Sequence, residues 1–197
     1  MKLYDDIPAF ILAGGKSTRM GQDKALLNLD GKPLIELVSA TLDKLFSNIT
    51  ILSDEKEPYA FLKLPIQSDI LKDSGPLAGI HAALVRTTAK HIFVMSCDLP
   101  FVTSKLIERI VDKRFEADVV MPADKKFIQP LCAVYSRAAF QHVVLHLRER
   151  QYSVVRCIQD MKTLTVSTNK NGTKTGFSIL ANIATPDEFE RLQSFKD

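Results

Sequence analysis

The sequence contains few cysteines, and they are widely spaced. Only three occur in 197 residues, Cys97, Cys132 and Cys157, and no two of them form a C-x-x-C pair. An odd number of scattered cysteines argues against a disulfide framework and against a thiolate metal site. We therefore predict that all three are small buried thiols in a reducing compartment, since free cysteine is among the most buried residue types.

Long apolar runs and long runs of like charge are absent as well. No apolar stretch approaches the ~20 residues that span a bilayer, and the first residues are too acidic for a signal peptide. The 26 Lys and Arg residues against 23 Asp and Glu give a net charge of +3, with no block that marks a nucleic-acid arm or a membrane-surface helix. We expect a cytoplasmic protein with no nucleic-acid or membrane partner. Because no repeat, low-complexity tract or linker interrupts the chain, residues 1–197 are predicted to form a single domain.

Strand-like segments alternate with helix-like segments along the chain, which predicts an α/β fold with three α/β/α layers and a Rossmann-like, mostly parallel sheet. Residues 7–13 are apolar on both faces, as in a central strand covered by helices on either side. The other expected strands are 49–53, 64–68, 91–97, 119–122, 127–135, 163–167 and 178–183. Helices are expected from Pro33, from Gly75-Pro76, from about Thr103 as the cap, over 137–150 and 154–160, and from Pro186.

A glycine-containing loop follows the first expected strand. Gly14 and Gly15 have no side chains, so the backbone can approach a ligand closely and direct N–H groups toward a phosphate or a base edge. Arg19 and Lys24 add two positive charges to the same loop. The alternative is an ordinary βα turn with solvated Arg and Lys, because such turns are common where strands end.

Two better-known phosphate-binding loops do not fit this segment. A Walker A loop needs a glycine where the chain has Phe10, and the Rossmann fingerprint needs one where the chain has Lys16. Ser17 lacks the G-x-S-x-G context of a hydrolase nucleophile.

The loop does, however, resemble a known signature. The sequence L-A-G-G-x-x-x-R-M-G-x-x-K over residues 12–24 is similar to that of sugar-nucleotide-type nucleotidyltransferases, and most similar to the molybdenum cofactor guanylyltransferase family. The resemblance continues, in the family's order, at residues 75–80, 97–100, 129–131 and 182–187. It implies a fold like that of the nucleotide-diphospho-sugar transferases.

The resemblance also implies roles for particular residues. Catalytic roles would fall to Arg19, Lys24 and Asp98, and Asp98 would hold Mg²⁺, the one cofactor expected. Asn182 would help to hold the pterin phosphate. The nucleotide would contact Leu12, Ala13, Gly14, Gly15, Lys24, Asp69 and Asp98.

The position of Asp98 supports its assigned role independently. It follows an apolar strand, and open α/β sheets bind their ligands at the carboxyl ends of such strands. A lone carboxylate suits Mg²⁺, which takes its remaining ligands from phosphates and water. The alternative, that Asp98 caps the next helix, is disfavoured because Thr103 is the expected cap of that helix.

These observations predict an enzyme that transfers GMP from GTP to the terminal phosphate of molybdopterin and releases pyrophosphate. Transient contacts with molybdopterin-synthesis proteins and molybdoenzyme chaperones are implied as well. Two alternatives remain open: a CTP-dependent cytidylyltransferase acting on molybdopterin or another small phosphate, and a non-catalytic nucleotide-binding regulator. Base choice is expected to depend on backbone groups around residues 12–14.

Two further features are expected to be structural. His142 and His146 have the i, i+4 spacing of a zinc pair, but the Glu of H-E-x-x-H is missing, so we assign them to a partly exposed helix face. Tyr135 and the phenylalanines occupy core-like positions and receive no role.

Overall fold

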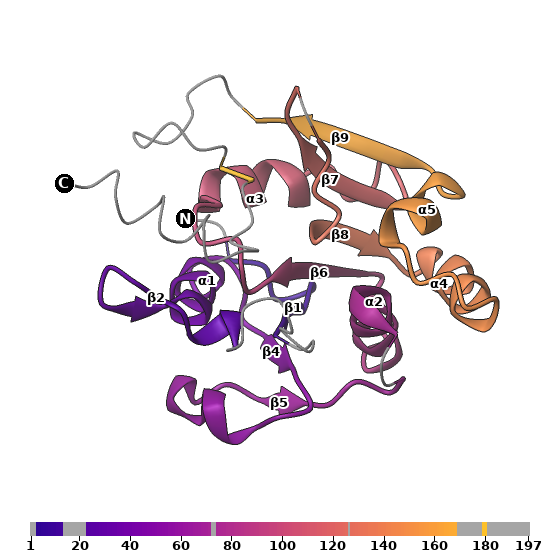
Figure 1. The fold of residues 1–197 in the computed structure, drawn as a ribbon. Helices are drawn as coiled ribbons and strands as arrows, with labels where there is room; N and C mark the ends of the chain where they lie inside the picture. Colours follow the sequence, from indigo (N-terminus) through magenta and orange to yellow (C-terminus); the bar gives the residue numbers. More distant parts are fainter. Residues whose placement is uncertain (1–2, 14–22, 72–73, 126, 169–178, 181–197) are drawn as a thin grey trace.

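A seven-stranded sheet runs through the protein, in the order β5-β4-β1-β6-β8-β7-β9 (Figure 1). We analysed a computed structural model that describes residues 3–13, 23–71, 74–125, 127–168 and 179–180. The strands are β1 (Ala9–Leu12), β4 (Ile49–Leu52), β5 (Ile66–Gln67), β6 (His91–Ser96), β7 (Val119–Ala123), β8 (Cys132–Ser136) and β9 (Thr163–Ser167).

The sheet is mostly parallel, as predicted. Strands β5, β4, β1 and β6 all run in one direction, and β7 and β9 are parallel to each other, whereas β8 is antiparallel to both of its neighbours. The carboxyl ends of β5, β4, β1 and β6 therefore lie along one edge of the sheet. The beginning of β8 lies at the same edge, because β8 runs against β6.

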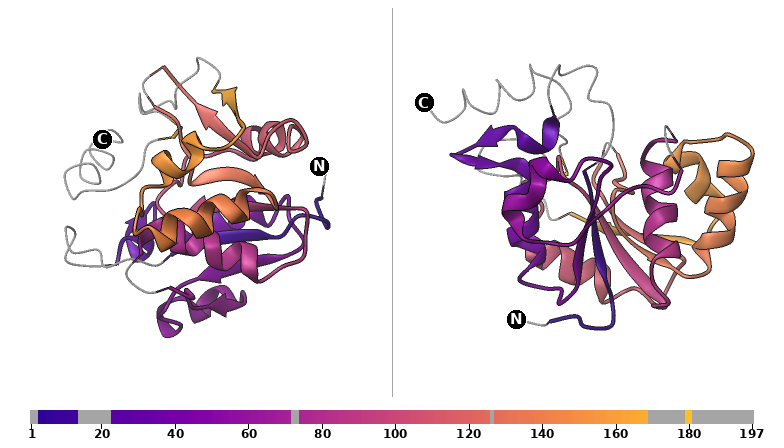
Figure 2. Two further views of the ribbon diagram at one scale, coloured as in Figure 1. Left: turned by 90° about the vertical axis from the view of Figure 1, so that its right-hand side faces the viewer. Right: turned by 90° about the horizontal axis from the view of Figure 1, so that it is seen from below.

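Helices cover both faces of this sheet (Figure 2). Helices α1 (Leu34–Leu42) and α3 (Ser104–Val111) supply one hydrophobic core, and α2 (Gly75–Val85), α4 (Ala139–Arg148) and α5 (Val154–Gln159) supply the other. Successive residues of β1 alternate between the two cores, with Ile11 in the first and Leu12 in the second. The expected three-layer α/β/α architecture is confirmed.

Short elements complete the described chain. Two 3₁₀ helices, η1 (Lys24–Leu26) and η2 (Glu57–Leu62), precede β2 and β5 respectively, and β2 (Asn28–Leu29) pairs with β3 (Lys32–Pro33) in a small hairpin. No helix in the described ranges is long and apolar enough to cross a membrane.

Several predicted boundaries need correction. The strand expected over 127–135 begins only at Cys132, because a turn closed by the Cys132 N–H and the Gln129 carbonyl precedes it, and Pro130 in that turn has no N–H to donate to a ladder. Of the strand expected over 178–183, only Ile179 and Leu180 are described, and they lie in a turn. The helix expected from Pro186 lies outside the described residues, and the single-domain assignment remains a prediction.

Some of the residues expected in the core are exposed instead. Tyr135 and the three cysteines are buried, as predicted, and burial raises the pKa of the Cys157 thiol to about 11. Phe61, Phe115 and Phe127, however, are 49%, 71% and 40% exposed. Phe115 lies just beyond α3, where its ring contacts the Arg114 guanidinium rather than the core.

Candidate active site

The carboxyl ends of three neighbouring strands bring the predicted nucleotide-binding residues together. The Ala13 N–H donates to the Leu52 carbonyl of β4 at 3.0 Å, and the Cys97 N–H after β6 donates to the Leu12 carbonyl at 3.1 Å. Leu12 and Ala13 are thereby held between the ends of β4 and β6. Asp98 directly follows Cys97, so the strand pairing also brings this carboxylate to the end of β1.

Asp98 occupies a turn that follows β6, and it is only 8% exposed. The alternative role as a helix cap is wrong, because the Thr103 hydroxyl caps α3 by accepting a hydrogen bond from the Leu106 N–H. Asp98 lies well before that helix, at the edge where open α/β sheets bind ligands.

Three charges lie close enough to the Cys97 thiol to affect it. Burial raises the pKa of Cys97 well above its usual value, the negative charges of Asp98 and Asp23 raise it further, and the positive charge of Lys24 lowers it. Asp98, Asp23 and Lys24 therefore share one electrostatic neighbourhood at this edge of the sheet. A carboxylate and an ammonium in such proximity form a site suited to a ligand that carries both phosphate charge and a counter-cation.

Lys24 is held in place by the helix that it begins. The Asp23 carboxylate caps η1 by accepting a hydrogen bond from the Ala25 N–H at 3.0 Å. Ala25 is fully buried and anchors the helix to the core, while Lys24 is half-buried. The cap and the buried alanine therefore fix the backbone from which the Lys24 side chain extends.

Tyr59 is a site residue that the sequence analysis missed. Its side chain extends from η2 and is 2% exposed, and its hydroxyl lies 3.0 Å from the Ala13 carbonyl and 2.5 Å from Asp23 Oδ2. Burial, followed by the hydrogen bond to Asp23 and the charge of Asp23, raises the pKa of Tyr59 far above its usual range. The only local signal in the sequence is Pro58 at the beginning of a short helix, and it says nothing about the long-range contacts.

Asp69 lies on the same edge, but further along it. It follows β5, which is two strands from β1, so roughly 10 Å separates the two chain ends at ordinary strand spacing. Asp69 Oδ1 is buried and accepts no hydrogen bond from the residues that the structure describes. Burial raises the pKa of Asp69 and the charge of Asp54 raises it further, whereas Arg86 opposes both effects.

Helix α2 packs closely against the end of β1. A Cβ atom added at Gly79 would lie 2.8 Å from Leu12 Cδ2, well inside ordinary van der Waals contact. Gly79 therefore allows the helix to approach the strand without displacing Leu12. The Leu12 side chain therefore packs directly against the helix at this position.

The remaining predicted site residues lie outside the described ranges. These are Gly14, Gly15, Arg19 and Asn182, and their roles remain predictions. Within the described residues, no group of three or more His, Cys, Asp or Glu side chains gathers as a metal cage. The single carboxylate of Asp98 nevertheless fits Mg²⁺, which binds through few protein oxygens and prefers hard ligands.

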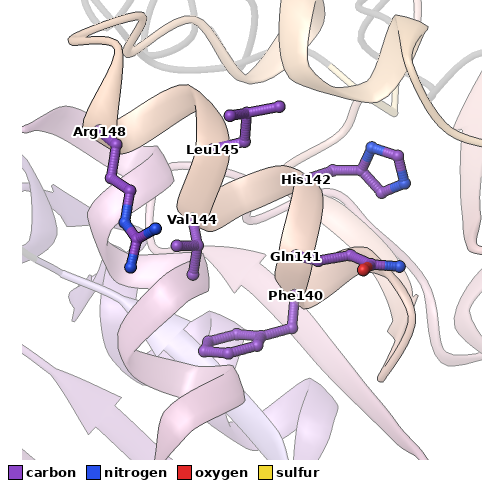
Figure 3. A pocket seen from close by; sticks show the side chains of 6 residues that line it. All are labelled: Phe140, Gln141, His142, Val144, Leu145 and Arg148. Atoms are coloured by element: carbon purple, nitrogen blue, oxygen red, sulfur yellow. The ribbon is translucent and has the colours of Figure 1, made fainter.

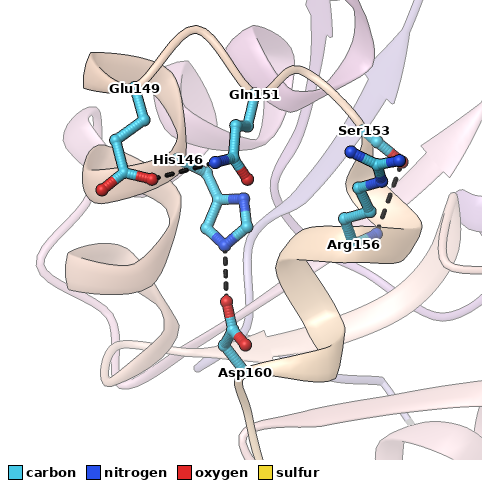
Figure 4. A network of polar contacts seen from close by, with 6 residues as sticks. All are labelled: His146, Glu149, Gln151, Ser153, Arg156 and Asp160. Carbon is cyan, nitrogen blue, oxygen red and sulfur yellow. Dashed lines mark hydrogen bonds and ion pairs between the residues drawn. The ribbon is translucent and has the colours of Figure 1, made fainter.

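The two histidines of α4 have different surroundings. His146 is 5% exposed, and its Nε2 atom lies 2.6 Å from Asp160 Oδ2 after α5 (Figure 4). The expectation of a partly exposed position was wrong for His146, because α5 covers this side of the helix. A separate hollow runs along the outer side of α4 and is lined by Phe140, Gln141, His142, Val144, Leu145 and Arg148 (Figure 3). It contains none of the candidate site residues.

Comparisons with known proteins show what the whole chain is similar to. The family described as the MobA-like NTP transferase domain matches residues 9–164. A probable molybdenum cofactor guanylyltransferase of Carboxydothermus hydrogenoformans is 33% identical over 185 residues, which cover 92% of each chain.

Two solved structures have the same fold. The molybdopterin-guanine dinucleotide biosynthesis protein A of Archaeoglobus fulgidus superposes with a TM-score of 0.79 at 23% identity, covering 100% of this chain and 98% of that one. A CMP:2-keto-3-deoxy-manno-octonic acid synthetase in complex with CTP superposes with a TM-score of 0.72 at 12% identity, covering 96% and 98%. At these identities the likeness concerns the fold alone, which is that of the nucleotide-diphospho-sugar transferases.

Proposed function

Because the chain belongs to the molybdenum cofactor guanylyltransferase family, we propose that this nucleotidyltransferase transfers GMP from GTP to molybdopterin, in an Mg²⁺-dependent reaction that releases pyrophosphate. The product would be the molybdopterin guanine dinucleotide cofactor. The observation that carries the proposal is the convergence of Leu12, Lys24 and Asp98 at one edge of the sheet.

The reaction places simple demands on the protein. The terminal phosphate of molybdopterin attacks the α-phosphorus of GTP, a new P–O bond forms, and the bond to the oxygen that bridges the α- and β-phosphorus breaks. The nucleophile is already an anion, so no general base is required. The site must instead hold two anionic substrates in line and neutralise the charge that collects on the α-phosphate and on the leaving pyrophosphate.

The chain has residues suited to each of these tasks. Lys24 and Arg19 would neutralise the triphosphate, and the Gly14 and Gly15 amides would donate hydrogen bonds to it. Asp69 would contact the nucleotide from the end of β5, and Asn182 would hold the pterin phosphate. Preorganised charge contacts of this kind are typically worth 10²- to 10³-fold in rate.

Asp98 is the residue that would hold Mg²⁺. Its carboxylate lies at the edge of the sheet and, like Lys24, close enough to the Cys97 thiol to shift its pKa. One hard oxygen ligand from the protein leaves room for phosphate and water ligands. When bound, the ion would supply positive charge to the phosphates, in addition to that of the basic side chains.

Base choice is expected to depend on the backbone groups at the end of β1. The N–H of Ala13 is already donated to Leu52, so Ala13 offers a base only its carbonyl, and Leu12 likewise presents a carbonyl. Each carbonyl has a second lone pair beyond the one used by Tyr59 or by Cys97. The Leu12 carbonyl points toward β6 and Ala13 faces β4, so one base edge would meet only one of the two carbonyls, and either the N1–H or N2–H group of guanine or the N4 amino group of cytosine could donate to it.

The labile product would also need a recipient. We expect transient contacts with molybdopterin-synthesis proteins and molybdoenzyme chaperones, which would deliver the substrate and receive the cofactor. Crosslinking of the chain to either class, with and without bound product, would detect such a transfer.

Pyrophosphate release from each of the four nucleoside triphosphates, in the presence of molybdopterin and Mg²⁺, tests the proposal. We expect turnover with GTP and at least tenfold less with the others, since loss of a paired hydrogen bond costs about that factor or more. Preference for CTP would identify a cytidylyltransferase instead. Saturable GTP binding without turnover would identify a regulator, and either result contradicts the proposal.

A further inference from the structure

We infer that Tyr59 is a positioning residue for nucleotidyl transfer, because its hydroxyl ties Ala13 to Asp23. Through this tie Tyr59 would fix where Lys24 stands relative to the end of β1. The inference rests on the proposed function for its kinetic consequences, but not for the tie itself.

The contacts of Tyr59 join two parts of the chain that border the candidate site. The hydroxyl lies 3.0 Å from the Ala13 carbonyl, the last described group at the end of β1, and 2.5 Å from Asp23 Oδ2, at the beginning of the next described segment. The separations from Tyr59 are 46 and 36 residues. One side chain from η2 therefore sets the spacing between Ala13 and Asp23.

The hydroxyl hydrogen of Tyr59 points toward Ala13 and Asp23, which both accept it. The phenol has a single hydrogen, which it shares between the two acceptors in a bifurcated hydrogen bond, and the shorter contact goes to the carboxylate, the stronger acceptor. The raised pKa of Tyr59 keeps that hydrogen in place across the physiological pH range. Tyr59 is also 2% exposed, so water does not compete for the bond.

Asp23 links Tyr59 to the short helix that begins at Lys24. Its Oδ2 atom meets Tyr59, while its Oδ1 atom accepts the Ala25 N–H and so caps η1, of which Lys24 is the first residue. Both oxygens of the carboxylate are thus engaged, and rotation of the side chain would break one bond or the other. A group that must neutralise a triphosphate benefits from such fixed placement, because a displacement of ~1 Å near reacting groups costs up to about 10² in rate.

The test compares Tyr59→Phe with Tyr4→Phe. Tyr4 is a matched control, since it is also 2% exposed and donates its hydroxyl hydrogen to a carboxylate, Asp112, but it pairs with Phe46 before β4 begins, at the opposite edge of the sheet. Both variants keep the ring and lose the hydroxyl that donates to a carboxylate, so we expect similar decreases in melting temperature. Only Tyr59→Phe is expected to lower kcat/KM for transfer, by about tenfold. Equal activity of the two variants would overturn the inference.

A double-mutant cycle with Asp23→Ser isolates the tie. Serine is an equally good helix cap, but its one oxygen would accept the Ala25 N–H and leave none for Tyr59. We expect Asp23→Ser to lower kcat/KM by about tenfold and addition of Tyr59→Phe to lower it little further, because both changes remove the same contact. A hundredfold loss in the double variant would mean independent effects, contrary to the inference.

Hydrogen–deuterium exchange of the nucleotide-free protein separates the tie from the proposed reaction. Exchange over residues 23–29 is expected to be faster in Tyr59→Phe than in Tyr4→Phe or the unmodified chain. Absence of turnover with any nucleotide in the unmodified chain would contradict the proposed function alone. Unchanged exchange over 23–29 would contradict the role of Tyr59.

Discussion

Replacement of Gly79 by alanine tests whether helix α2 sets the position of Leu12. The added Cβ would lie 2.8 Å from Leu12 Cδ2, so the two groups must separate by roughly 1 Å to reach an ordinary carbon–carbon distance. Leu12 is 8% exposed and packs among the buried residues between α2 and the sheet, so the strain is shared with its neighbours. Overpacking of this kind costs about 1–3 kcal/mol, and alanine recovers about 1 kcal/mol of helix propensity. The free energy of unfolding is therefore expected to fall by about 0–2 kcal/mol.

The functional effect of Gly79→Ala should exceed this small loss of stability. The clash is with the tip of the Leu12 side chain, so the test asks whether the strain reaches the Leu12 carbonyl, which is expected to contact the base. If it does, we predict about a tenfold higher KM for GTP, measured by pyrophosphate release, in a variant that is still fully folded. Leu12→Ala provides the matched test, because removal of the Cδ atoms makes room for the new Cβ at residue 79. The double variant should therefore lose less affinity for GTP than the sum of the losses in Gly79→Ala and Leu12→Ala. An unchanged KM together with a gain of about 1 kcal/mol in stability would refute the reasoning, since helix propensity alone would then explain the result.

Three other substitutions test the charged residues of the site. Lys24→Ala is expected to lower kcat by 10²- to 10³-fold, and a change confined to KM would contradict a role in charge neutralisation. Asp98→Ala should abolish Mg²⁺-dependent transfer while circular dichroism remains unchanged, so near-normal activity would refute the metal assignment. Asp69→Asn should weaken GTP binding yet stabilise the nucleotide-free protein at pH 7, because burial raises the pKa of Asp69 and its ionisation as the pH rises costs folding free energy. That stabilisation should disappear below about pH 4, where Asp69 is protonated in both folded and unfolded chains, and a stability gain that is independent of pH would contradict the assignment.

The parts of the fold that follow from local pattern could be predicted from the sequence. The apolar run before Asp98 predicted β6, and the hydroxyl of Thr103 predicted the beginning of α3, which together placed Asp98 at the binding edge. Strand β8 was predicted too long, because Gln129 and Pro130 stand in a turn whose hydrogen bonds the apolar pattern does not reveal. Periodicity reports which side of an element is apolar, and it does not report where the hydrogen-bonded ladder begins.

The parts of the site that depend on contacts distant in sequence could not be predicted. Tyr59 lies in a segment without clear periodicity, and its two partners are 46 and 36 residues away. The burial of His146 likewise depends on α5, whose packing against α4 is a tertiary feature. Gly79 belongs to one of the sequence motifs. The reason for a glycine there, the 2.8 Å distance between an added Cβ and Leu12 Cδ2, follows only from the packing of α2 against β1.

The fate of isotopic label tests the central claim most directly. The chain is incubated with molybdopterin, Mg²⁺ and GTP labelled with ³²P at either the α- or the γ-phosphate, and the pterin product and pyrophosphate are separated. Transfer of GMP predicts that α-label appears in the pterin product and that γ-label appears only in pyrophosphate. Recovery of γ-label in the pterin, or of all the α-label in unreacted GTP, would contradict the account.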